Sequence, residues 1–272
     1  MKNIFQMEYK APSEHGYAIV DRLLIPDLDE QVEKIELISP VLEPQAHLYP
    51  WLVSMHDLPY RYWEEMIKAS EGLAGEPPLI KFFFNSSQPL DQLKRNLVNA
   101  LYVKDTDGAG YIVRYYDPSV FFQYCWFLGS AGIKKLLSMD DAFEVTFYHV
   151  GQWLTLPARQ HEKYGSAHSK VSVADFVLFS KSIKSINNMT ARTQSIPEKL
   201  QQSAHVYQAL ALAIKEFGLQ QASDLESFAT LYLEHNKDFY KEEAFQRILK
   251  QSVGNPGYFH LESTYLLKHG GF

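Results

Sequence analysis

Three histidines and a glutamate lie close together in the middle of the sequence and have the side chains that bind metal ions. His161 and His168 are seven residues apart, Glu162 adjoins the first of them, and His149 lies upstream. A zinc-protease helix needs two histidines four residues apart, so that both imidazoles face one metal ion. The observed spacing does not meet this requirement, and the segment is polar and loop-like. We therefore expect no metal site and no bound cofactor.

Two other residues resemble the nucleophiles of hydrolases but have unsuitable surroundings. Ser130 follows Gly129 directly, whereas a nucleophile elbow needs glycines two residues before and two residues after the serine. Helix C-caps explain Gly129 and Gly132 better. Cys125, the single cysteine, lies among aromatic residues, where burial raises the pKa of a thiol and makes it unreactive. A single thiol also excludes an intrachain disulfide and a cysteine-based zinc site.

The remaining candidates for chemistry have simpler structural explanations. Gly108-Ala109-Gly110 precedes an expected strand, whereas a phosphate-binding loop leads from a strand into a helix. Asp140-Asp141 and Glu242-Glu243 are adjacent couples, whose side chains point in different directions and cannot straddle a substrate. No catalytic signature remains, so we expect a protein that is not an enzyme.

Composition, net charge and the length of the apolar runs exclude some classes of binding partner. The chain has 272 residues, of which 46% are hydrophobic and 14% aromatic, which is ample for a buried core. Its formal net charge of −6 does not attract nucleic acid or anionic lipid. The first ten residues lack the apolar run of a secretory signal, and the longest apolar stretch, residues 120–128, is far short of the ~20 residues of a membrane span. We expect a cytoplasmic protein with no nucleic-acid or membrane partner.

The elements that must position these residues fall into two groups. Residues 1–157 mix apolar runs typical of strands with helical periodicity. We expect strands over residues 17–20, 51–55, 79–84, 111–115, 143–148 and 152–154, and helices over 59–67, 87–101, 117–128 and 133–137. Asp117-Pro118 is a strong helix start, because aspartate caps free amide groups and proline fits the first helical position.

Residues 158–169 are polar and form the expected connection to a second domain, residues 170–272, whose pattern is helical throughout. Ser195 with Glu198, and Ser223 with Glu226, have the spacing of capping boxes at two helix starts. The expected fold class is α+β or α/β, with an N-terminal mixed-sheet lobe carrying helices, followed by a C-terminal α-helical lobe.

The segment Arg114-Tyr115-Tyr116-Asp117-Pro118 concentrates charge and aromatic surface where a strand meets a helix. One interpretation is structural: Asp117 caps the helix, Arg114 pairs with a carboxylate of Asp21 or Asp117, and the tyrosines pack. If that pair is buried, loss of Arg114 costs on the order of 3 kcal/mol. The other interpretation is an interaction surface, because arginine and tyrosine are typical interface residues.

Four segments occur in an order that resembles a known family. They are Tyr17-Ala18-Ile19-Val20-Asp21, Tyr49-Pro50-Trp51-Leu52-Val53, Leu90 to Leu97, and the segment from Arg114 to Pro118. Together they resemble the bacterial type VI secretion effector adaptors, also called effector chaperones, over about residues 17–155. An Ala-Pro-Tyr-Leu-like motif of that family is Tyr49-Pro50-Trp51-Leu52 here. The arginine that follows Asp-Pro in the family is replaced by Ser119, which removes one charge.

The resemblance implies a non-enzymatic role. Such adaptors bind a toxic effector in the cytoplasm of the producing cell, often at its amino-terminal region, and help to load it onto a VgrG-type spike. The candidate partner-binding residues are Tyr49, Trp51, Arg114, Tyr115, Tyr116 and Asp117, and the candidate structural residues are Tyr17, Asp21 and Pro118. Two alternatives stay open: an enzyme with a small-molecule pocket between the two lobes, and an immunity-type protein that neutralises a toxin by binding it.

Overall fold

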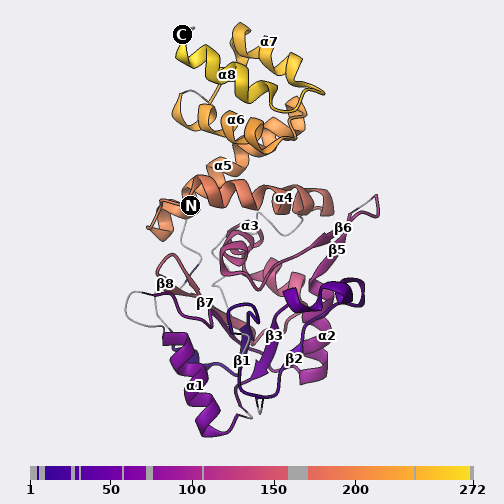
Figure 1. Ribbon diagram of the computed structural model, residues 1–272, viewed down its shortest axis with the longest axis vertical. Helices are drawn as coiled ribbons and strands as arrows, with labels where there is room; N and C mark the ends of the chain where they lie inside the picture. Colours follow the sequence, from indigo (N-terminus) through magenta and orange to yellow (C-terminus); the bar gives the residue numbers. More distant parts are fainter. Residues whose placement is uncertain are drawn as a thin grey trace. The chain divides into compact units, whose positions relative to one another are not determined.

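The computed structural model (Figure 1) describes residues 5, 10–25, 28–30, 32–56, 58–71, 76–105, 107–158, 171–235 and 237–269. The chain divides into two compact units, Lys2–Ala174 and Asp175–Phe272. Apart from Ala158, the expected connection over residues 158–169 lies outside the described residues.

Within the described residues, the first unit is built on a six-stranded antiparallel sheet. The strand order is β2-β3-β1-β4-β7-β8, and each pairing in the sheet is antiparallel. The strands are β1 (Tyr17–Val20), β2 (Ile35–Glu36), β3 (Trp51–Ser54), β4 (Phe82–Asn85), β7 (Glu144–His149) and β8 (Gln152–Leu156). The α+β form of the predicted fold class is therefore confirmed, and the sheet is antiparallel rather than mixed.

Helices cover both faces of this sheet. Helix α1 (Tyr60–Glu71) packs Tyr62 and Met66 into a core that includes Phe83. On the opposite face, Phe121 of α3 (Pro118–Leu137) lies with its ring 4.9 Å from that of Phe82. Successive strand residues point to opposite faces, so a sheet covered on both sides needs apolar residues at every position. This explains the unbroken run Phe82-Phe83-Phe84, which is buried throughout.

A separate hairpin precedes α3. It consists of β5 (Tyr102–Lys104) and β6 (Gly110–Ile112) and follows α2 (Leu90–Ala100), which packs on α3. Figure 1 shows this hairpin extending beyond the main sheet. The predicted strand over residues 111–115 is too long, because β6 ends at Ile112 and residues 115–116 form a turn into α3. The strand β5 was not predicted.

Helix α3 changes direction at Gly129. The backbone there is non-helical, with φ of 68° and ψ of 174°, a conformation that suits glycine. The two predicted helices, residues 117–128 and 133–137, therefore correspond to the two parts of α3 on either side of this break. The expected cap at Gly132 is wrong, because Gly132 lies within the second part.

The second unit is helical over its described residues. Its helices are α4 (Val173–Met189, which begins just before the unit), α5 (Ile196–Phe217), α6 (Ala222–Glu234), α7 (Glu243–Ser252) and α8 (Tyr258–Lys268), with the short 3-10 helix η4 (Phe239–Lys241). Both predicted capping boxes are wrong. The Ser195 side chain makes no capping hydrogen bond, and α6 starts after Gln221, so that Ser223 lies inside it. The helix α8 was not predicted. Among the described residues of the chain, no helix is both long and apolar enough to cross a bilayer.

Two buried charges stabilise helix ends in this unit. Asp224 of α6 accepts hydrogen bonds from the backbone N–H groups of Gly257 and His260, both at 2.8 Å, at the N-terminus of α8. Lys199 of α5 donates to the carbonyl oxygen of Thr190 at 2.7 Å, just beyond the C-terminus of α4, and burial lowers its pKa. Each charge has the sign that the adjacent helix dipole favours.

A buried histidine connects the start of the first unit to its sheet. His15 Nε2 lies 2.8 Å from the hydroxyl of Thr146 in β7, and that hydroxyl lies 2.9 Å from the hydroxyl of Thr155 in β8. His15 Nδ1 lies 3.2 Å from the side-chain nitrogen of Asn85 in β4. Burial, with a smaller contribution from the positive charge of Lys10, lowers the pKa of His15 from 6.5 to about 3.

The lowered pKa of His15 predicts that the protein is less stable in mild acid. Folded His15 stays neutral below pH 6.5, whereas unfolded His15 binds a proton there, so the free energy of unfolding falls as the pH drops from about 6.5 towards 3. Between about pH 7 and pH 5 we expect the wild type to lose about 2 kcal/mol relative to His15→Gln. Tryptophan fluorescence during urea unfolding measures this, because Trp51, Trp63, Trp126 and Trp153 all lie in the first unit. Parallel stability curves for the two proteins would contradict it.

The turn between β7 and β8 predicts a stabilising substitution. Val150 and Gly151 are the two residues of this hairpin loop, and their φ angles are 51° and 74°. Positive φ at both positions is typical of a type I′ turn, which favours Asn-Gly and strains a β-branched residue. We expect Val150→Asn to raise the free energy of unfolding by roughly 0.5–1 kcal/mol, measured by the same fluorescence. An unchanged or lower value would show that the strain is absent.

Candidate functional site

Strand pairing brings two of the motif segments together. β1 and β3 are antiparallel neighbours, and Val20 at the end of β1 lies opposite Trp51 at the start of β3. Asp21, which follows β1, and Tyr49, which precedes β3, therefore lie at the same end of this strand pair. The register of a buried sheet thus joins residues that are 28 positions apart in the sequence.

A further motif segment, residues 114–118 at the N-terminus of α3, lies near Asp21 and Tyr49. The charge of Arg114 acts on the hydroxyl of Tyr49, and Tyr116 interacts electrostatically with Arg114, Tyr49 and Asp21. We call this group the aromatic corner: Asp21, Tyr49, Arg114, Tyr116 and Asp117. Three of the four segments that carry the family resemblance contribute to it.

Arg114 is the exposed charge of the aromatic corner. Its Nη2 lies 3.4 Å from Oδ2 of Asp117, and its Cζ lies 5.9 Å from the centre of the Tyr116 ring. The side chain of Arg114 is 58% exposed and that of Asp117 26% exposed. The carboxylate partner is therefore Asp117 rather than Asp21, and the pair is not buried, so the condition for a cost of about 3 kcal/mol is not met. An ion pair in this setting contributes between about 0 and 1 kcal/mol to stability.

Asp117 has a second, structural role at the start of α3. Its Oδ1 accepts hydrogen bonds from the backbone N–H of Ser119 at 3.0 Å and from the Ser119 hydroxyl at 2.6 Å. Pro118 occupies the first position of the helix. The predicted cap is confirmed. The hydroxyl of Ser119 adds a second hydrogen bond to this cap.

Three of the candidate partner-binding residues are buried. Tyr49, Trp51 and Tyr115 are each at most 9% exposed, and the Tyr115 hydroxyl donates a hydrogen bond to the carbonyl oxygen of Leu97 in α2 at 2.9 Å. Burial raises the pKa of Tyr115 well above its ordinary value of 10. Burial also raises the pKa of Tyr116, against the lowering effect of Arg114. Of the proposed contact residues, Arg114 is therefore the most accessible, with Tyr116 and Asp117 partly so.

The candidate structural residues lie in supporting positions. The Tyr17 ring stacks on Phe84 with 5.3 Å between centroids. Asp21 Oδ1 accepts a hydrogen bond from the backbone N–H of Leu23 at 2.9 Å and so closes the turn that follows β1. Asp21 therefore supports the end of β1 at which the aromatic corner lies, whereas Tyr17 supports the opposite end of that strand.

Two further cations lie over the Trp51 ring and were missed by sequence reasoning. The guanidinium of Arg22 lies 4.7 Å from the Trp51 ring centre, donates to the carbonyl oxygen of Ala46 at 2.9 Å and pairs with Glu36 at 3.2 Å. The ammonium of Lys34 lies 5.3 Å from the same ring. The sequence offered one indication of Arg22, because this residue directly follows the first motif segment. Its position over Trp51 depends on the register of β1 and β3, which the sequence pattern does not give.

Exposed apolar side chains surround these cations along the chain. Leu23 and Leu24, in the turn after Arg22, are 59% and 45% exposed. Val41 and Leu48 are also exposed and lie in η2 (Pro40–Leu48), a 3-10 segment that Arg22 contacts through Ala46. The turn after β1 therefore exposes apolar side chains next to the guanidinium of Arg22.

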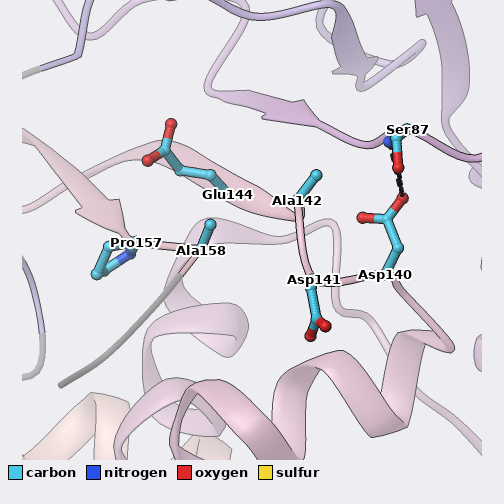
Figure 2. Close-up of a pocket in the computed structure, with 7 residues that line it drawn as sticks. All are labelled: Ser87, Asp140, Asp141, Ala142, Glu144, Pro157 and Ala158. Carbon is cyan, nitrogen blue, oxygen red and sulfur yellow. Dashed lines mark hydrogen bonds between the residues drawn. The ribbon is translucent and has the colours of Figure 1, made fainter.

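An open depression of about 710 Å³ lies elsewhere in the first unit. Its lining includes three carboxylates, and Figure 2 shows that those of Asp140, Asp141 and Glu144 point in different directions. Oδ2 of Asp140 accepts hydrogen bonds from the N–H and hydroxyl of Ser87, both at 2.7 Å, and anchors the loop before α2. Partial burial raises the pKa of Asp140, but these hydrogen bonds outweigh it and lower the value. Asp140 is thus a loop anchor rather than an ordinary surface acid.

The candidate nucleophile Cys125 and the candidate metal-binding residues complete the comparison with the sequence analysis. Cys125 is fully buried, and burial raises its pKa well above the ordinary value, so its predicted position in the core is confirmed. In the part of the chain that the structure describes, no group of three or more His, Cys, Asp or Glu side chains could hold a metal ion. His161, Glu162 and His168 lie outside the described residues.

The contacts of Asp117 and Arg114 predict that removing these two side chains lowers the free energy of unfolding by different amounts. Asp117→Ala removes a helix cap and should lower the free energy of unfolding of the first unit by about 1 kcal/mol. Arg114→Ala removes only an exposed pair and should lower it by less than about 0.5 kcal/mol, as should Arg61→Ala, whose exposed pair with Glu65 is a matched control. Urea unfolding followed by tryptophan fluorescence distinguishes the two. A larger loss for Arg114→Ala than for Asp117→Ala would restore the buried-pair interpretation.

Comparison with known proteins identifies one family match. Residues 16–126 match the model of a family described as a domain of unknown function, DUF4123. A search of curated proteins found no match to the chain, and a search of solved structures likewise found none. The matched segment begins one residue before β1 and ends within α3, so that it contains all four segments of the resemblance and every residue of the aromatic corner.

Proposed function

We propose that this protein is a cytoplasmic, non-enzymatic adaptor that binds a type VI secretion effector and assists its loading onto a VgrG-type spike. The single observation that carries this proposal is the convergence of the motif segments on one exposed arginine. The segments from residues 17–21, 49–53 and 114–118 were singled out by their likeness to effector adaptors, and in the fold they form the aromatic corner. The family match over residues 16–126 covers the same segments.

The form of the corner suits an adaptor. Tyr49 is buried, and the guanidinium of Arg114 lies 5.9 Å from the centre of the Tyr116 ring with more than half of its side chain exposed. A rigid base reduces the entropy lost when a partner orders the surface side chains. Arginine and tyrosine with neighbouring leucines can then contact an effector without any chemical step.

An adaptor must also release its client. An interface of standard size, about 1,600 Å², is sufficient for specific binding. An adaptor that binds only the folded client stabilises it by about 2.7 kcal/mol when its free concentration exceeds the dissociation constant a hundredfold. Much tighter binding would oppose transfer to the spike, so we expect a moderate affinity.

Co-purification tests the proposal. The tagged full chain would be co-expressed with toxin-like products of neighbouring genes, each as the full protein, as its amino-terminal region and as its toxic domain, with and without the spike protein. We expect a stoichiometric complex with the full effector and its amino-terminal region, measured by size-exclusion chromatography with light scattering.

The alternatives give different results in the same experiment. Binding to the toxic domain alone would favour an immunity-type protein. The absence of any complex, while circular dichroism shows the tagged chain to be folded, would contradict the adaptor function. A small-molecule ligand would then be the next hypothesis to test.

A further inference from the structure

The β5–β6 hairpin forms a sheet of two strands, so each strand has one edge without a neighbouring strand. Its pairing continues beyond the strand ends. The backbone N–H of Asp105 donates to the carbonyl oxygen of Ala109 at 2.9 Å, and that of Val113 donates to the carbonyl oxygen of Leu101, also at 2.9 Å. The edge of β6 therefore runs straight from Ala109 to Val113.

Two residues of β6, Gly110 and Ile112, direct their backbone groups away from β5. In an antiparallel ladder, residue pairs that exchange hydrogen bonds alternate with pairs that do not, and the groups of the latter face outward. The bonds of Asp105 and Val113 fix this alternation. Gly110 and Ile112 are both exposed, and in the part of the chain that the structure describes their N–H and C=O groups have no hydrogen-bond partner.

The other outer strands among the described residues are less suited to accept a neighbour. β2 has two residues and carries Glu36, and residues 154–156 of β8 are buried. β5 carries the exposed Lys104. Short length, charge and proline are the features that keep natural sheet edges from pairing. Residues 109–113 contain neither a charged residue nor a proline, so charge and proline do not protect the β6 edge.

The hairpin turn holds this edge in shape before a partner arrives. A two-stranded hairpin alone is only marginally stable in water. Here Oδ1 of Asp105 accepts hydrogen bonds from the backbone N–H groups of Asp107 at 3.0 Å and Ala109 at 2.8 Å. Its Oδ2 accepts a hydrogen bond from the Tyr111 hydroxyl at 2.9 Å. An edge ordered in advance loses less entropy on binding.

One face of the hairpin is apolar next to this edge. Tyr102 lies directly opposite Ile112, so the two side chains share a face, and Gly110 lies on the same face. The Tyr102 side chain covers Gly110, because a Cβ atom added there would lie 1.7 Å from the Tyr102 hydroxyl oxygen. Ile112 is 45% exposed. A strand beside β6 would place side chains against Ile112 and the Tyr102 ring.

We propose that an extended segment of the effector binds as an additional strand beside β6. Its backbone pairs with the N–H and C=O groups of Gly110 and Ile112, and its uncharged, apolar side chains cover Ile112 and Tyr102. The occupant follows from hydrogen-bond complementarity, because an extended backbone presents donors and acceptors at the repeat of the β6 edge. The inference rests on the proposed adaptor function and specifies how the client is held. Arg114 of the aromatic corner follows Ile112 by two residues, a reach of about 7 Å.

A second copy of this chain is the competing occupant, because two β6 strands could pair with each other about a two-fold axis. A stable dimer buries about 1,600 Å². Pairing of two strands of three residues each provides much less area. A client that also contacts the aromatic corner is not limited to this area, so the effector segment is the favoured occupant.

The first test is the affinity of the purified full chain for the amino-terminal region of the effector found by co-purification, measured by calorimetry. Ile112→Pro removes an outward N–H without breaking a hydrogen bond of the hairpin, and proline is tolerated at such edge positions. It should weaken binding by about tenfold. The matched control is Lys104→Pro, which removes an outward N–H from the other edge of the same hairpin. It should bind within about twofold of the wild type.

A second pair of variants keeps every backbone group and so remains informative if Ile112→Pro does not fold. Ile112→Lys places a charge on the edge and should weaken binding by several-fold. Leu79→Lys should not, although Leu79 is similarly exposed, at 48%. Hydrogen exchange followed by NMR should show the amides of Gly110 and Ile112 protected in the complex, with those of Tyr102 and Lys104 unchanged.

The outcomes separate this inference from the proposed function. If the effector region binds, but the Ile112 variants keep their affinity and the amides of Gly110 and Ile112 are not protected, the added strand is wrong while the adaptor function stands. Equal loss with Lys104→Pro or Leu79→Lys would also overturn the inference. So would a dimer of the wild type alone, seen by light scattering and abolished by Ile112→Lys, because a second copy would then occupy the edge. If no effector region binds the folded wild type, both proposals fail.

Discussion

The antiparallel register between β1 and β3 is the constraint on which the rest of the first unit depends. Val20 lies opposite Trp51, so the turn after β1 and the end of η2 emerge side by side. A shift of one residue would move every side chain to the other face of the sheet. Because helices cover both faces, such a shift would replace well-packed residues on both sides. The same burial that stabilises the sheet therefore fixes where Arg22 and Tyr49 lie.

The aromatic corner uses this frame to keep a charged side chain accessible. Tyr49 is buried, the neighbouring Tyr115 donates a hydrogen bond to a carbonyl oxygen of α2, and Asp117 caps α3. Arg114 is consequently supported without being enclosed. In the second unit, by contrast, the charged side chains of Asp224 and Lys199 are buried and form hydrogen bonds with backbone groups at helix ends, so they stabilise the fold. Exposure thus distinguishes a charge available to a partner from one that holds the structure together.

Local signals in the sequence predicted much of this fold. Asp117-Pro118 specified the start of α3, because cap and proline act within one helical turn. The apolar run over residues 79–84 predicted a strand, although its burial on both faces emerged only from the structure. The failures involve context. Ser195 and Ser223 have the spacing of capping boxes but form none. In contrast, α8, which was not predicted as a separate helix, is capped by a residue distant in the sequence, Asp224. The exposure of Arg114 and the contact between Arg22 and Trp51 depend on tertiary packing, which a one-dimensional pattern does not contain.

The central claim is that the partner of this protein is bound at the aromatic corner. Hydrogen–deuterium exchange of the full chain, with and without the effector's amino-terminal region, tests this most directly. We predict slower exchange for backbone amides in the turn over residues 22–24, in η2 and between Ile112 and Asp117, with α8 unchanged. Protection confined to α8 or to other parts of the chain, with unaltered exchange in these three segments, would contradict the account.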